Sequence, residues 1–263
     1  MLYKYLIMIL VFVLIIGSLS YIFAENSVED GDYIILVHGL GRSKFSMLEP
    51  AIFFRTKGYQ VINFDYPSTE YKIQELSEKY LHDAIKKCKD DDKKINFVTH
   101  SLGGIIVRYY LNKYNLENIG RVVMLSPPNN GTKLADIIGD FPSIRWRNGP
   151  AIGQLKTDRE SLPNSLGPVN FETGIITGNR SYSIFSSLLL SGEDDGKVSV
   201  KSAKVKNMKD FLIVNRTHTF IMNSDIVLEQ AYNFIKYGRF RENIDTEINL
   251  NNFQLEILNY IEQ

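Results

Sequence analysis

Short apolar runs alternate with helical stretches along most of this 263-residue chain. Each run is strand-like in length, and the first ends at a turn formed by His38 and Gly39. Alternation of this kind is typical of βαβ units, in which helices cover both faces of a parallel sheet. The sequence therefore predicts an α/β protein with a mostly parallel central sheet. The expected strands are 33–37, 59–64, 95–99, 122–125, 174–177 and 211–214, and the expected helices are 45–57, 73–88, 102–113 and 224–237.

The first residues form a different kind of segment. No charged residue occurs from Tyr5 to Ala24, whereas Lys4 precedes this stretch and Glu25 follows it. A positive residue ahead of an apolar run is typical of export signals, and this run is also long enough to span a bilayer as an apolar helix. We expect residues 1–24 to be a cleaved signal peptide or a retained signal anchor. Either places the body outside the cytoplasm, anchored in the cell membrane facing outward or released as a periplasmic or secreted protein.

Residues 25–240 contain no repeat and no linker, so we expect them to form one domain. Between residues 127 and 172 the alternation gives way to Gly, Pro and Asn with short apolar pieces. A loop region of this length inside a compact domain is usually functional, and we expect a lid or pocket wall. The tail, 241–263, has spaced apolar positions and is expected either to dock on the surface as a helix or to bind a partner.

Composition argues against several classes of function. Lys+Arg and Asp+Glu both number 30, so the formal net charge is zero and nothing in it favours nucleic acid as a partner. The single cysteine, Cys88, excludes an intramolecular disulfide framework and a multi-cysteine metal site. We expect neither a metal nor an organic cofactor.

The most specific motif is THSLGG at residues 99–104, where an expected strand ends and an expected helix begins. A serine on a tight strand-to-helix turn is exposed above the sheet and can act as a nucleophile, here Ser101. Strand and helix cross closely at such a turn, and Gly103 and Gly104 supply the small residues that this crossing needs. Thr99 departs from the first glycine of the usual G-x-S-x-G pattern.

A serine nucleophile needs a base that is itself oriented by an acid. His218 is the only histidine that follows Ser101, and it comes directly after the expected strand 211–214, where a base is well placed. The acid should lie between them in the sequence. We prefer Asp195 because Gly196 permits a sharp turn after it, and Asp194 remains the alternative.

The tetrahedral oxyanion of acyl transfer needs backbone N–H donors. One should be Leu102, directly after the nucleophile. The other should come from the loop after the first strand, 37–41 (VHGLG), whose glycines allow close approach to substrate. This makes the N–H of Leu40 the second candidate donor.

Four segments together resemble bacterial lipases and esterases of the α/β-hydrolase superfamily, most closely the lipase class 2 and PGAP1-like branch. They are HGLG at 38–41, THSLGG at 99–104, PPNNGT at 127–132 and DGKV at 195–198, supported by HTF at 218–220 and YGRF at 237–240. The resemblance covers about residues 32–240. It implies an α/β-hydrolase fold with Ser101 as nucleophile, Asp195 as acid and His218 as base. Asn130 departs from relatives that often carry histidine there.

These patterns predict a serine hydrolase of carboxylic esters, acting on small-molecule or lipid esters through a Ser-Asp-His triad and an acyl-enzyme. The preference for acyl lipids rests on the resemblance, the export segment and the expected lid. Membrane contact is expected through the N-terminal segment. Two alternatives stay open: an acyltransferase or lipid-remodelling enzyme with the same triad, and a non-catalytic binding protein with a hydrolase fold.

Overall fold

A computed structural model describes residues 30–139, 141, 147–182 and 192–241. Within these ranges six strands form one sheet in the order β2-β1-β3-β4-β5-β6, and each neighbouring pair is parallel. The parallel α/β architecture predicted from the sequence is thus confirmed. The strands are β1 (Tyr33–Val37), β2 (Gln60–Asn63), β3 (Ile95–His100), β4 (Ile119–Leu125), β5 (Thr173–Gly178) and β6 (Asp210–Val214).

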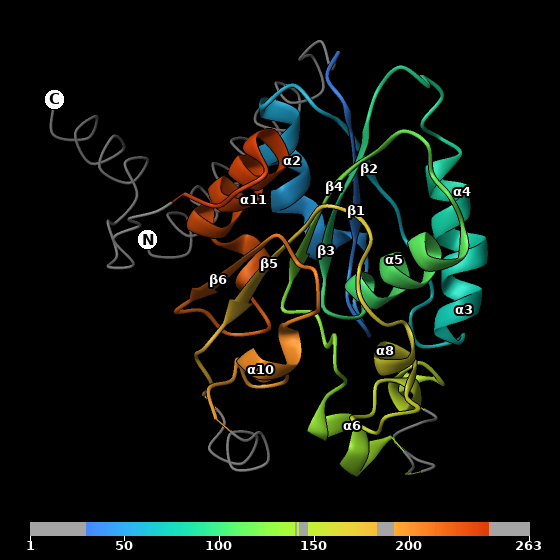
Figure 1. Ribbon diagram of the computed structural model, residues 1–263, viewed down its shortest axis with the longest axis vertical. Helices are drawn as coiled ribbons and strands as arrows, with labels where there is room; N and C mark the ends of the chain where they lie inside the picture. Colours follow the sequence, from blue (N-terminus) through green and yellow to red (C-terminus); the bar gives the residue numbers. More distant parts are fainter. Residues whose placement is uncertain (1–29, 140, 142–146, 183–191, 242–263) are drawn as a thin grey trace, which may run out of the picture.

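Helices cover both faces of the sheet (Figure 1). On one face lie α2 (Leu48–Thr56) and α11 (Asp225–Tyr237), and on the other lies α5 (Leu102–Lys113) with α3 (Ile73–Glu75) and α4 (His82–Ile85) outside it. Because successive strand residues point to opposite faces, the strands contribute to two separate cores.

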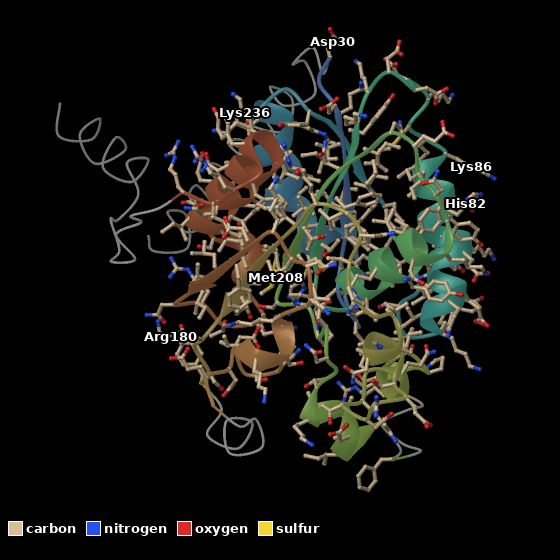
Figure 2. The ribbon with its side chains drawn as sticks, in the orientation of Figure 1. Asp30, His82, Lys86, Arg180, Met208 and Lys236 are labelled. Atoms are coloured by element: carbon tan, nitrogen blue, oxygen red, sulfur yellow. The ribbon has the colours of Figure 1, made fainter. Side chains whose placement is uncertain are left out.

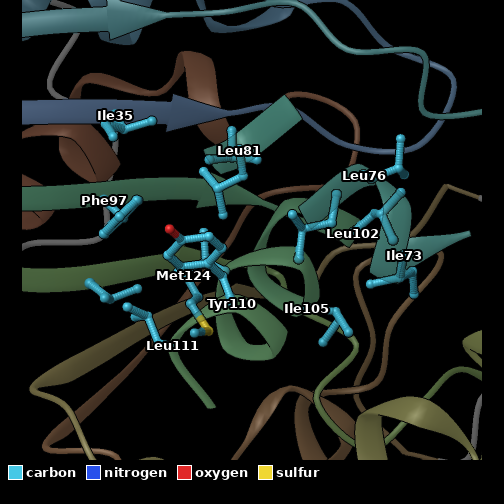
Figure 3. Packing of buried hydrophobic residues seen from close by; sticks show 14 of the residues in the cluster. Ile35, Ile73, Leu76, Leu81, Phe97, Leu102, Ile105, Tyr110, Leu111 and Met124 are labelled. Atoms are coloured by element: carbon cyan, nitrogen blue, oxygen red, sulfur yellow. The ribbon is translucent and has the colours of Figure 1, made fainter. Parts of the chain in front are cut away.

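The core beneath α5 is the larger of the two. Ile35 and Phe97 project from the sheet toward Ile105 and Tyr110 of α5 (Figure 3). Their neighbours in the strands, such as Ile34, instead pack with the residues of α2 and α11. This burial fixes the start of α5 against the sheet, and that start carries the site described below.

The expected helix 73–88 forms with an irregular middle. α3 and α4 are joined by a π-helical segment, Leu76–Leu81, whose wider turn adds a residue to the helix. Ser77 is fully buried there and donates to the carbonyl of Ile106 in α5 at 3.1 Å. The wider turn lets both Leu76 and Leu81 be buried in the core beneath α5 (Figure 3).

Region 127–172, expected as irregular, contains several short helices. The buried guanidinium of Arg108 joins its two ends: Nη1 donates to the Asn129 carbonyl at 3.1 Å and Nη2 to that of Gly167 at 2.8 Å. Short helices outside the main layers include α6 (Lys133–Ile138), α8 (Leu162–Ser165), α10 (Val200–Ala203), η1 (Lys44–Met47), η3 (Ile152–Gln154) and η4 (Ile221–Asn223). α6, α8 and α10 lie together at the lower end of the molecule in Figure 1.

Two expectations concern segments outside the described residues. The N-terminal apolar helix expected within 1–24 is one of them, and the tail from residue 242 onward is the other. In the ranges that the structure describes, no helix is long and apolar enough to cross a membrane.

Candidate active site

Ser101 lies between the end of β3 and the start of α5 in a backbone conformation that few residues other than glycine adopt. Its φ is 52° and its ψ is −119°. Such a conformation costs on the order of 1–3 kcal/mol and persists only where the surroundings hold it. Here Ser101 N–H donates to the Leu125 carbonyl at 2.9 Å, and Gly104 N–H donates to the Ser101 carbonyl at 3.0 Å.

Gly103 explains why small residues follow the serine. A Cβ added to Gly103 would lie 2.4 Å from the carbonyl oxygen of Val37, at the end of β1. The helix therefore begins in close contact with the neighbouring strand, and a larger side chain would push the two apart. This agrees with the requirement for small residues that the sequence predicts.

Three predicted residues from separate segments of the sequence meet in one hydrogen-bonded chain. His218 Nε2 lies 3.0 Å from Ser101 Oγ, and His218 Nδ1 lies 2.8 Å from Asp195 Oδ2. His218 and Asp195 are both buried. The arrangement can pass a proton from the hydroxyl to the imidazole while the carboxylate fixes the ring.

The carboxylate of Asp195 is strongly supported by hydrogen bonds. Its Oδ1 accepts from the backbone N–H groups of Lys197 at 3.0 Å and Val198 at 2.8 Å. Burial acts to raise the pKa of Asp195, but His218 and the hydrogen bonds from His218, Ser126 and Val198 outweigh it and hold this pKa below its usual value. Asp195 therefore faces the imidazole as a charged carboxylate at neutral pH.

The Asp194 carboxylate is hydrogen-bonded within its own turn instead. Its Oδ1 accepts from the N–H of Gly196 at 2.7 Å, and Gly196 has a φ of 98°. That left-handed conformation is the one glycine adopts at no steric cost, so the sharp turn expected after Asp195 forms. The structure thus places Asp195, of the two candidates, beside His218.

Ser126 and His100 are two further residues of the site, and the sequence predicts no catalytic role for either. Ser126 is fully buried at the end of β4 with a φ of 49°. His100 Nε2 lies 2.9 Å from the carbonyl of His218, which can only accept, so Nε2 carries the proton. Burial and the neighbouring His218 lower the pKa of His100 far below its usual value, and the ring stays neutral. The sequence contains no short motif that would predict the contacts of Ser126 and His100.

The loop after β1 is held rigidly beside Ser101. His38 is buried, stacks on Tyr66 with ring centroids 3.9 Å apart, and places Nε2 3.2 Å from Asp65 Oδ1. Gly41 N–H donates to Ser68 Oγ at 2.9 Å. These contacts fix Leu40, the expected oxyanion donor, in the wall of the pocket into which Ser101 opens.

The second expected donor, Leu102, is the first residue of α5. N–H groups in the first turn of a helix have no acceptor within the helix, so they are free to bind an oxyanion. Both candidate donors thus adjoin the serine.

Ser101 and His218 line a pocket of about 130 Å³. Most of its wall is apolar, and region 127–172 supplies much of it: Pro128, Leu134, Ile138, Ile152 and Leu155. A larger and more polar cleft of about 700 Å³ adjoins it, and Arg42 and Asn148 line both. The site therefore offers an apolar side and a polar side to a molecule bound at Ser101.

A family model described as the alpha/beta hydrolase fold matches residues 32–166. The chain belongs to the α/β-hydrolase family. Among curated proteins, this α/β-hydrolase is similar to the probable lysophospholipase L2 of Haemophilus influenzae, with 29% identity over 107 residues. The match covers 36% of this chain and 34% of that protein, so it spans about a third of the relative's length.

Solved structures with the same fold include a lipase and a phospholipase. The lipase BlEst2 of Bacillus licheniformis in its propeptide form aligns with a TM-score of 0.67 and 19% identity, over 81% of this α/β-hydrolase and 52% of the lipase. Phospholipase PlaB from Legionella pneumophila aligns with a TM-score of 0.60 and 18% identity, over 76% and 57% of the two chains. At such identities the likeness shows a shared fold.

Other reactive groups of this α/β-hydrolase lie away from the site. His82 is on α4 at the periphery (Figure 2), with Nδ1 2.9 Å from the Tyr110 hydroxyl. In the part of the chain that the structure describes, no three His, Cys, Asp or Glu side chains gather as metal ligands would. Cys88 is half-buried in the same region of the sequence as His82.

Cys88 is expected to be an unreactive thiol. Burial raises its pKa to about 12. Since the thiolate is the reactive form, the folded protein should react with Ellman's reagent at pH 8 about 1,000-fold more slowly than a free cysteine. The same protein unfolded in urea is the control and should react promptly and completely. Equal rates in the two states would contradict the burial of this thiol.

Proposed function

We propose that the protein is a carboxylic ester hydrolase of the lipase and esterase type, with Ser101, Asp195 and His218 as its catalytic triad. The observation that carries the proposal is the hydrogen-bonded chain from Ser101 Oγ through His218 to Asp195. Ser101 attacks the acyl carbonyl while His218 Nε2 takes its proton, and the Asp195 carboxylate stabilises the imidazolium that forms.

The N–H groups of Leu40 and Leu102 hold the oxyanion of the tetrahedral intermediate. His218 then gives its proton to the leaving alcohol, and an acyl-enzyme remains on Ser101. Water loses a proton to His218 as it attacks this ester, and release of the acid restores the serine. Apart from the attacking water, every group in this mechanism is a residue of the chain itself.

Acyl lipids are the proposed substrates. The apolar pocket beside Ser101 suits an acyl chain, and region 127–172 acts as its wall and lid. The lipase, phospholipase and probable lysophospholipase among the similar proteins support a lipid ester, as does the motif likeness to the lipase class 2 and PGAP1-like branch. Residues 1–24 direct the enzyme out of the cytoplasm and bring it to the membrane. Mass spectrometry of the N-terminus tests this, and an intact Met1 on cytosolic protein would contradict export.

The test of the proposed function is hydrolysis of p-nitrophenyl esters of increasing acyl length by the full chain, followed by labelling with a fluorophosphonate. We expect p-nitrophenol release and a covalent adduct on the peptide that contains Ser101. Maximal rates on short chains would make the enzyme an esterase, and maximal rates on long chains a lipase. No hydrolysis and no adduct would overturn the proposal and favour a binding protein.

A further inference from the structure

Two cationic side chains, Arg42 and Lys197, line the pocket that holds Ser101. Arg42 follows Leu40 on the loop after β1, and Lys197 follows Asp195 on the turn that supports the triad. They come from distant parts of the sequence yet lie close enough for their charges to repel. Among the described residues, neither side chain has a hydrogen-bond or ion-pair partner.

The surroundings of Lys197 offset this repulsion only in part. Its side chain reaches solvent, but burial of the ammonium lowers its pKa, and the charge of Arg42 lowers it further. Asp195 acts in the opposite direction, yet both of its oxygens are already engaged by His218 and by backbone N–H groups. An anion bound between the two cations would offset their repulsion.

Positive charge continues from Arg42 into the polar cleft. Arg42 lies at the boundary between the two cavities, and Arg147 lines the cleft beyond it. Asp65 is the one carboxylate among the described residues that line this cleft, and it is already engaged: Oδ1 accepts from Lys44 N–H at 3.2 Å and lies 3.2 Å from His38 Nε2. The cleft thus carries more positive than negative charge, although the whole chain is neutral.

The apolar and charged parts of the pocket wall determine how an ester would be oriented at Ser101. Apolar side chains from region 127–172 line one part of the pocket that contains Ser101, while Arg42 and Lys197 supply its charged lining, and Arg42 also lines the polar cleft. An ester carbonyl held at Ser101 would place its acyl chain against the apolar wall. Its alcohol part would then extend toward Arg42 and Lys197.

We propose that Arg42 and Lys197 bind an anionic group, of phosphate or carboxylate type, on the alcohol side of the ester that Ser101 attacks. The preferred substrates are then acyl esters with an anionic headgroup. A guanidinium pairs with such groups through two parallel N–H donors, and an ammonium adds a point charge. This inference rests on the proposed function, because it takes Ser101 as the reacting atom.

The kinetic test compares two soluble lipids that share one acyl chain: 1-octanoyl-glycerol-3-phosphate, which is anionic, and 1-octanoylglycerol, which is neutral. For the wild type we expect a higher kcat/KM on the phosphate ester. Arg42→Gln and Lys197→Gln should each lower the anionic-to-neutral ratio of kcat/KM about tenfold, mainly through KM, as expected for loss of one charged hydrogen bond. Arg159→Gln and Lys206→Gln, exposed cations that line neither cavity, are the matched controls and should keep the wild-type ratio.

Inorganic phosphate distinguishes a lipid headgroup from a free anion. It should inhibit hydrolysis of 1-octanoylglycerol competitively in the wild type and about tenfold more weakly in Arg42→Gln. Phosphate inhibition without any preference for the anionic ester would show that a free ion occupies the subsite, which would overturn the substrate assignment.

Binding to a variant that cannot turn over separates this inference from the proposed function. Calorimetry with Ser101→Ala should detect binding of 1-octanoyl-glycerol-3-phosphate, and adding Arg42→Gln should weaken it about tenfold. If the anionic lipid bound in an Arg42-dependent way but the wild type hydrolysed no ester, the proposed function would be overturned and the anion subsite would stand. If hydrolysis depended on Ser101 but the anionic-to-neutral ratio of kcat/KM were equal in the wild type and Arg42→Gln, the hydrolase assignment would stand and the anion subsite would be overturned.

Discussion

Replacement of Ser101 by alanine is expected to reduce kcat for p-nitrophenyl ester hydrolysis by about 10⁵- to 10⁶-fold, as when a triad nucleophile is removed elsewhere. Without Oγ no acyl-enzyme can form, and His218 can only activate water in its place. The low residual rate would come from substrate binding and from the oxyanion donors. Ser101→Ala removes a hydroxyl without adding volume, so the fold should persist.

The measurement is the steady-state release of p-nitrophenol, with thermal unfolding followed by circular dichroism. Ser165→Ala is the matched control, because the Ser165 hydroxyl donates a hydrogen bond to the Leu162 carbonyl in α8, away from the pocket. It should retain wild-type rates. A Ser101→Ala variant that kept even one part in a hundred of the activity would disprove the assignment of the nucleophile, since the loss expected there is at least about 10⁵-fold.

Replacement of Asp195 by asparagine should lower kcat by about 10⁴-fold. The amide is uncharged, so it cannot stabilise the imidazolium, and it disfavours the tautomer in which His218 Nδ1 carries the proton. Asp194→Asn is the matched comparison and should lose less than about tenfold, because the asparagine oxygen can still accept from Gly196 N–H. A larger loss at Asp194 than at Asp195 would reverse the choice between them.

Acidification gives a second readout on Asp195. Its pKa in the folded protein is held below the usual value, so its charged form adds stability above the ordinary carboxyl range. This contribution is lost as pH falls through the folded pKa. Asp195→Asn should remove that part of the acid sensitivity, which melting curves between pH 3 and pH 7 would show as a smaller decline.

The core of the fold was accessible from the sequence because its signals are local. The first strand, β1 (Tyr33–Val37), and α5 (Leu102–Lys113) have the predicted bounds. An apolar run that ends at His38-Gly39 and a helix that begins directly after Ser101 are both marked by adjacent residues. Helix α6 was harder to predict because it has only six residues, although its N-cap, Thr132, accepts from Leu134 N–H at 3.3 Å.

The same distinction applies to the site. Ser101, Asp195 and His218, which the structure brings together, could be proposed as a site because each adjoins a turn or strand end that the sequence marks. Ser126 and Arg42 carry no comparable signal. Their positions beside Asp195 and Lys197 depend on how distant segments pack, and this packing cannot be derived from spacing along one chain.

The contacts of Arg108 have a consequence for how chains with this fold diverge. Its buried guanidinium holds Asn129 and Gly167 in place, so the ends of the chain between them stay fixed whatever that chain contains. Once the ends are held, even doubling the length of a flexible loop costs only about 0.6 kcal/mol in closure entropy. Insertions between these two ends can therefore reshape the pocket beside Ser101 at little entropic cost, while the sheet that positions Ser101 and His218 stays the same.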